Sequence, residues 1–148
     1  MQEGTPCLDP ARPMGAVRTV ERAVLVPPAG PERPQPCGVF DAAGGFVSES
    51  LCYGGSASVP ATVMPQPAAA QGKLCGTWLF GGVISGHFGH MLCEATGRLW
   101  ALDRVGAVDG VVFFARPFDK VRQVRKAFAH LGAVLGLPKV EVVAAPVE

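Results

Sequence analysis

Residues 109–115 read "DGVVFFA", a short run of β-branched and aromatic residues that carries no charge after Asp109. Such a run, flanked by turn-forming residues, is typical of a strand that is buried on both faces. Two runs of similar character lie on either side of it, "TWLFGGVI" at 77–84 and "KVEVVAA" at 139–145. We therefore expect three strands in the second half of the chain.

The segments between these runs predict helices. In "HMLCEATGRLWALDRV" (90–105), four apolar residues fall on one helical face that would pack on a sheet: Leu92, Ala95, Leu99 and Leu102. Asp119 can cap a second helix, which Gly136 and Pro138 would end. Its apolar residues recur at helical spacing: Val121, Val124, Phe128, Leu131 and Leu135. The alternation of strands and helices predicts an α/β fold, a Rossmann-like parallel sheet with right-handed crossovers.

The first half of the chain is richer in proline and in short apolar runs. "VRTVERAVLV" (17–26) predicts a strand that stops at Pro27 and Pro28. "GVFDAAGGFVSES" (38–50) has apolar runs on both sides of Gly44-Gly45, which predicts a hairpin. We expect four segments in all: an irregular lead-in at 1–14, a β-rich region at 15–58, a Pro/Ala-rich connector at 59–73 and the β-α-β-α-β unit at 74–148.

Composition excludes several classes of function. The net charge of +1 over 148 residues is not that of a nucleic-acid-binding protein. No stretch approaches the roughly 18 apolar residues that span a bilayer, and the polar start of the chain lacks the apolar core of a secretory signal. The five cysteines are odd in number and include no C-x-x-C pair, which favours reduced thiols over disulfides or a zinc site. We therefore expect a cytoplasmic protein without a transmembrane segment.

A polar cluster follows the first of the three predicted strands, in "SGHFGHMLCEATGRLWAL" (85–102). In a helix that starts near Gly89, the side chains of His90, Glu94 and Arg98 share one face, and His87 precedes them in the turn. Open parallel sheets bind ligands beyond the carboxyl ends of their strands, where this cluster is expected. A neutral imidazole there can accept a proton from a hydroxyl, with a carboxylate one turn away to fix its tautomer.

Other interpretations of the cluster remain open. Glu94 and Arg98 can form an ordinary i,i+4 ion pair while His90 bonds at the helix start, and spacing alone favours this structural interpretation. The glycine order in "GGVISGHFG" lacks the dinucleotide-binding pattern. A metal site would need His87, His90 and Glu94 to converge without an H-E-x-x-H motif, so we expect no metal. Cys93 follows Leu92 on the packing side, and a buried thiol is usually inert.

The stretch "WLFGGVISGHFGHMLCEATGRLWAL" resembles the N-terminal signature of glycosyltransferase family 61. The recurring element of this family is Asn or His, two residues, His, three residues, then Asp or Glu, which His87, His90 and Glu94 match. "RLWAL" (98–102) resembles the bacterial branch, whose members are associated with capsular polysaccharide synthesis, and "FDAAGGFVSES" resembles the segment that precedes the signature there. The resemblance covers roughly residues 20–148, by the expected order of the elements.

The resemblance implies an inverting transferase with two Rossmann-type domains and no required metal or cofactor. A nucleotide-sugar donor would be held mainly by a C-terminal domain, and a glycan acceptor by the N-terminal one. It implies His90 as base or positioning group and Glu94 as its orienting partner. The implied substrate-binding residues are His87, Arg98, Gly86 and Gly89.

The chain ends at Glu148, whereas members of this family continue into the donor domain. We therefore expect the acceptor-side part of such an enzyme, inactive alone and able to form homo-oligomers through an exposed sheet edge. A non-catalytic carbohydrate-binding or interaction module derived from such an enzyme is the alternative. A small hydrolase or isomerase that uses His90 and Glu94 is a third hypothesis, although no G-x-S-x-G elbow surrounds Ser85.

Overall fold

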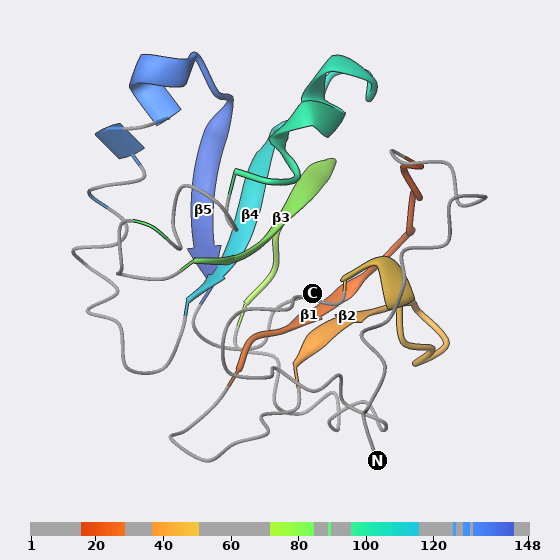
Figure 1. Ribbon diagram of the computed structural model, residues 1–148. Helices are drawn as coiled ribbons and strands as arrows, with labels where there is room; N and C mark the ends of the chain where they lie inside the picture. Colours follow the sequence, from red (N-terminus) through yellow and green to blue (C-terminus); the bar gives the residue numbers. More distant parts are fainter. Residues whose placement is uncertain are drawn as a thin grey trace, which may run out of the picture.

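The computed structural model describes residues 16–28, 37–50, 72–84, 89, 96–115, 126, 129–130 and 132–143. They form an α/β arrangement with two sheets (Figure 1). In the smaller sheet, β1 (Val24–Val26) pairs antiparallel with β2 (Gly38–Phe40). In the larger sheet, three parallel strands lie in sequence order: β3 (Trp78–Ile84), β4 (Gly110–Ala115) and β5 (Lys139–Val143). The three predicted strands and their parallel arrangement are confirmed.

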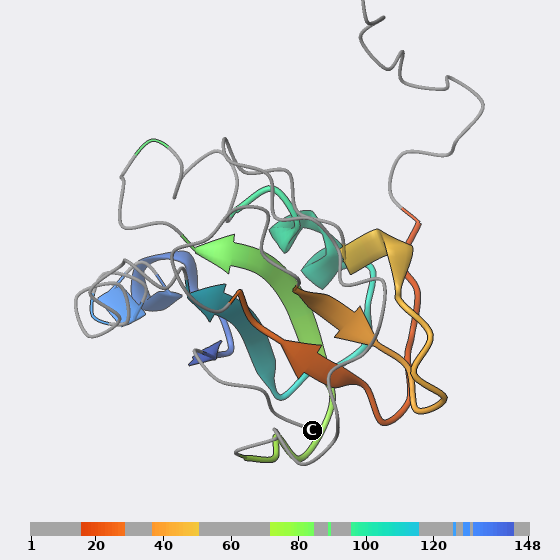
Figure 2. The same cartoon turned by 90° about the horizontal axis from the view of Figure 1, so that it is seen from below.

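Strand β4 is the centre of the core, because all six of its residues are buried. Val111, Phe113 and Ala115 point to one face of the sheet, where Leu99 and Leu102 of the 3-10 helix η4 (Leu99–Asp103) pack on them. The opposite face of β4 carries Val112 and Phe114. Against that face lies the β1–β2 unit, which is the two strands with residues 41–50 (Figure 2). Three of its residues pack there: Leu25, Val39 and Val47. The larger sheet is therefore covered by η4 on one face and by the β1–β2 unit on the other.

A β-bulge in β3 adjusts its side chains to these two faces. The register with β4 shifts between Phe80 and Gly82, so that Gly81 is the extra residue. Beyond the bulge, Val83 joins Phe80 on the β1–β2 side and Ile84 faces the η4 side. Without the extra residue, Val83 and Ile84 would exchange faces, because side chains alternate along a strand.

The amino ends of β3 and β4 are tied together by Asp109. Its Oδ2 accepts a hydrogen bond from the Thr77 N–H at 2.7 Å, and its own N–H donates to the Thr77 carbonyl at 2.8 Å. Gly76 has a φ of +100°, and a Cβ there would overlap the Asp109 carboxylate. The Asp109 that opens "DGVVFFA" therefore aligns the two strands at their starts.

The predicted strand at 17–26 is wrong for most of its length, since only Val24–Val26 pair with a neighbour. A turn at residues 21–22 interrupts the extended chain, and Arg22 has a φ of +49°, which a β-strand cannot contain. The β-branched residues upstream of this turn gain no partner strand among the described residues, so composition alone overestimated the strand.

The predicted hairpin at 38–50 is only partly formed. Asp41 closes a tight turn with Gly45, and Phe46 makes one antiparallel bridge to Phe40. The chain then enters the 3-10 helix η1 (Ser48–Ser50), whose buried Ser50 hydroxyl accepts from the Val39 N–H at 3.0 Å and donates to the Val47 carbonyl at 2.7 Å. These bonds fix η1 against β2.

The helix predictions need correction. An α-helix through 90–105 is wrong, because residues 96–98 form a bend and turn and residues 99–103 are 3-10 helix. Gly97 lowers helix propensity at this point. The second helix ends as expected: Gly136 has a φ of +62°, and the Leu137 N–H bonds the Gly132 carbonyl at 2.8 Å. Leu135, expected on its packing face, is instead 51% exposed.

Candidate functional site

The predicted site lies where β3 ends. Ile84 and Ala115 are register partners at the carboxyl ends of β3 and β4, and the predicted site residues come next after Ile84 in the sequence. Gly89 is helical and exposed. The other residues predicted at this edge lie outside the described residues: Gly86, His87, His90 and Glu94. Their proposed convergence stays a prediction.

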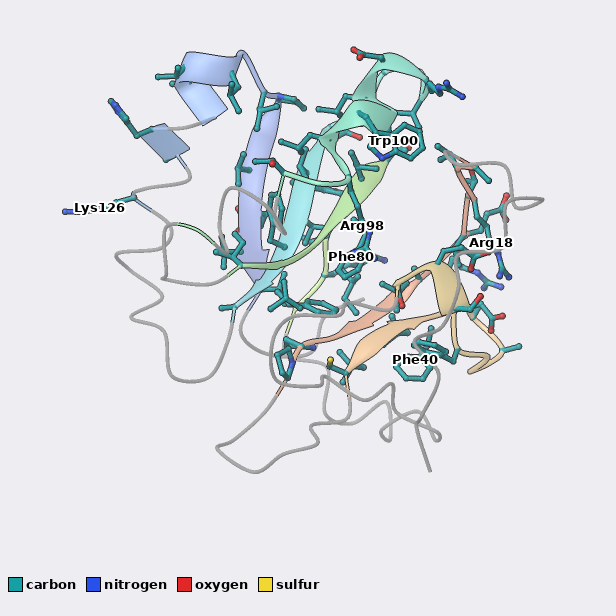
Figure 3. The ribbon with its side chains drawn as sticks, viewed as in Figure 1. Arg18, Phe40, Phe80, Arg98, Trp100 and Lys126 are labelled. Carbon is teal, nitrogen blue, oxygen red and sulfur yellow. The ribbon has the colours of Figure 1, made fainter. Side chains whose placement is uncertain are left out.

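Arg98 is the predicted site residue whose side chain can be placed. Its Nη2 donates to the Glu49 carbonyl oxygen at 3.1 Å. Its Cζ lies 5.4 Å from the centre of the Phe80 ring, over the ring face. Figure 3 shows Arg98 and Phe80 between the larger sheet and the β1–β2 unit. The guanidinium therefore links η1 to β3.

The position of Arg98 relative to His90 and Glu94 lies outside the described residues and stays a prediction. Phe80 precedes Ile84 by four residues, a distance of about 13 Å along a strand. The Arg98 side chain thus contacts Phe80, in the amino half of β3. The shared helical face of Arg98 with Glu94 also requires a continuous α-helix, which the turn at 97–98 breaks.

A hollow that the sequence did not predict lies between the β1–β2 unit and the larger sheet, and we call it the hairpin–sheet hollow. Its volume is about 1400 Å³. Its described lining includes residues 16–26, 73–80 and 104–108, together with Val39, Glu49, Arg98, Trp100 and Val112. Four side chains that can form ionic or stacking contacts line it: Arg18, Arg22, Trp100 and Arg104. The alternation of arginine with Trp100 in "RLWALDR" (98–104) is the sequence signal that could have indicated it.

Arginine side chains supply most of the charge that lines the hollow. Arg18 Nη1 lies 3.4 Å from Glu49 Oε2. A backbone hydrogen bond at Glu49 lowers the pKa of its carboxyl below the ordinary value, and the Ser48 hydroxyl and the Arg18 charge lower it further. Arg104 lies over the Trp100 ring, 5.7 Å from its centre. Glu49 therefore stays ionised to lower pH than a free glutamate, and its charge is directed to Arg18.

The described residues include no group of three or more metal-ligating side chains close enough together to hold a metal ion. Of the five cysteines, two lie among the described residues, Cys37 buried and Cys75 exposed. Within the described part of the chain, no helix is long and apolar enough to cross a membrane. Comparisons of the chain with protein-family models, with curated proteins and with solved structures found no match.

Proposed function

We propose that the chain is the acceptor-side part of an inverting glycosyltransferase that acts in cell-surface polysaccharide synthesis. The observation that supports this best is the parallel pairing of β3 with β4, whose carboxyl ends meet at Ile84 and Ala115. The predicted site residues follow Ile84 directly in the sequence, and open α/β sheets bind their ligands at this edge. The order β3-β4-β5 of the parallel sheet also supports the proposal, because half a Rossmann-type sheet would have three parallel strands in sequence order.

In the proposed reaction, a glycan hydroxyl attacks the anomeric carbon of a nucleotide sugar. The new C–O bond forms as the bond from the anomeric carbon to the phosphate oxygen breaks, and the nucleoside diphosphate leaves. The hydroxyl proton passes to the neutral imidazole of His90, and Glu94 stabilises the resulting imidazolium and holds its orientation. His87, Gly86 and Gly89 border the acceptor, and the donor is held by a domain outside these 148 residues.

The test uses the longest protein that the reading frame encodes, together with any separately encoded donor domain. It is incubated with a panel of nucleotide sugars and an oligosaccharide acceptor, and release of nucleoside diphosphate is measured. We expect His90→Ala to reduce turnover by a factor of about 100 or more, as loss of a general base does. Glu94→Gln should reduce it less, because the imidazole remains.

His130→Ala is the matched control, since His130 is an exposed helical residue between β4 and β5. It should leave turnover unchanged. Full activity of the His90→Ala protein would refute the proposed base. Acceptor binding without turnover, with every donor of the panel, would instead support the non-catalytic carbohydrate-binding alternative.

A further inference from the structure

The hairpin–sheet hollow carries exposed apolar side chains. Four large apolar side chains are exposed among the described residues, and two of them, Val17 (43% exposed) and Trp100 (41%), line this hollow. In Figure 3, Trp100 lies on η4, on the side of the molecule that faces the segment of Arg18. An exposed indole beside a hollow is a surface on which a flat, partly apolar ring can stack.

The hollow is also basic, although the chain as a whole carries a charge of only +1. Its described lining includes five basic side chains and two acidic ones. Glu49, one of the acidic pair, is directed to Arg18. Arg104 lies over the Trp100 ring, and no acidic partner within 4 Å is found for it among the described residues. A guanidinium and an exposed indole thus stand next to each other.

Arg22 provides a third, independent observation. It is the described non-glycine residue with a positive φ, +49°, and it lines the same hollow. A long side chain in the left-handed region is uncommon, and such strain concentrates at functional sites. The strained turn at residues 21–22 places a second basic residue of the 16–26 segment, after Arg18, in the lining of the hollow.

We propose that the hairpin–sheet hollow binds an anionic oligosaccharide whose sugars carry carboxylates. The C–H face of one sugar stacks on Trp100, and the carboxylate of that sugar or its neighbour pairs with Arg104. Arg22 pairs with the carboxylate of a sugar further along the oligosaccharide. The hollow lies along the amino half of β3, away from the edge where residues 85–95 begin, so this site does not depend on the transferase proposal.

The experiment measures binding of tetragalacturonic acid to the full chain by isothermal titration calorimetry and by tryptophan fluorescence. A neutral tetrasaccharide, cellotetraose, and a single-stranded oligonucleotide are the comparison ligands. We expect tetragalacturonic acid to bind more tightly than either. Arg104→Gln and Trp100→Leu should each weaken binding about fivefold or more, and Trp100→Leu should also abolish most of the fluorescence change.

Lys126→Gln is the matched control, because Lys126 is an exposed basic residue on the far side of the sheet (Figure 3). It should bind like the unaltered chain, and circular dichroism confirms that each variant is folded. Absence of binding, equal binding of cellotetraose, tighter binding of the oligonucleotide, or an equal loss in the Lys126→Gln protein would each overturn the proposal. Because turnover is not measured, failure here leaves the transferase proposal to its own test.

Discussion

Gly81 and Gly82 are neighbours in β3, but the structure requires glycine at each of them for a different reason. A Cβ on Gly81 would overlap the Phe113 ring, which packs against the backbone at this point. Gly82 has a φ of +104°, a conformation in which an L side chain is strained. The pair therefore forms the bulge that assigns Val83 and Ile84 to their respective faces.

Substitution of either glycine should destabilise the chain. We expect Gly82→Ala to lower the free energy of unfolding by about 1–2 kcal/mol through backbone strain, and Gly81→Ala by about 1–3 kcal/mol through overpacking against Phe113. Gly106→Ala is the control, because a Cβ there meets nothing within 4 Å. It should be neutral or stabilising by up to about 1 kcal/mol. Urea unfolding measures all three, and a neutral Gly82→Ala would contradict the assigned strain.

Glu49 predicts a pH dependence at the same scale. Its carboxyl pKa is lowered in the folded chain from the ordinary value of 4.5, first by a backbone hydrogen bond and then by Ser48 and Arg18. A lowered pKa means that the ionised form favours folding, so this stabilisation is complete above about pH 4.5 and is lost as the pH falls through the folded-state pKa.

The comparison of the unaltered chain with Glu49→Gln tests this dependence. Thermal unfolding from pH 7 to pH 3 should show a higher Tm for the unaltered chain at pH 7, and a difference that shrinks below pH 4.5. The effect is small, because the Glu49 side chain is 52% exposed and solvent screens its charge. A difference that stays constant or widens on acidification would show that the carboxylate does not favour the folded state.

At the scale of elements, the position of η1 depends on contacts that are distant in sequence. Arg98 reaches Glu49 across 49 positions and stacks on Phe80 as it does so. Arg98→Lys keeps the charge but loses the planar group that can stack and bond together. We expect a loss of about 1 kcal/mol in unfolding free energy, the typical value of one such hydrogen bond.

Arg104→Lys is the control for this change, since the Arg104 guanidinium lies over Trp100 in its own segment. Its effect should stay within about 0.5 kcal/mol, as for most surface substitutions. Equal effects of Arg98→Lys and Arg104→Lys in urea unfolding would mean that the link between η1 and β3 contributes no stability of its own.

The strands were predictable from the sequence because they are buried on both faces. A strand such as β4, with all six residues buried, needs a continuous apolar run, and that run is visible without any partner. The end of the second helix was predictable for a similarly local reason, since Gly136 supplies the positive φ of the cap. By contrast, residues 17–23 contain β-branched residues that pair with no strand in the described part of the chain.

Less of the candidate site than of the fold could be predicted from the sequence. Helical spacing predicted a place for Arg98 beside Glu94, which lies outside the described residues, but it did not predict the hydrogen bond from Arg98 to the Glu49 carbonyl. Neither is encoded in the local pattern, because the partner comes from a separate segment. The hairpin–sheet hollow was missed for the same reason. Arg22 and Arg104 are 82 positions apart in the sequence and line the same hollow only because the chain folds.

At the scale of the whole molecule, the two sheets share a core. Val112 of β4, 1% exposed, packs in one cluster with Leu25, Val39 and Val47 of the β1–β2 unit. Its neighbour Val111, fully buried, lies in the other cluster, whose partners are Phe113 and the η4 residues. The two valines therefore offer a matched pair, since they have the same side chain and strand and face opposite sides of the sheet.

Val112→Ala and Val111→Ala should each lower the global unfolding free energy by about 2 kcal/mol, the transfer and cavity cost of a truncated core side chain. They should differ in local opening. Val112→Ala weakens the attachment of the β1–β2 unit, so native-state hydrogen exchange at the Val39 and Val47 amides should accelerate about tenfold more than in Val111→Ala. Both amides are hydrogen-bonded, to Ser50 Oγ and to the Val39 carbonyl, and thus report on this unit. Equal exchange rates in the two variants would mean that the β1–β2 unit opens only when the entire chain unfolds.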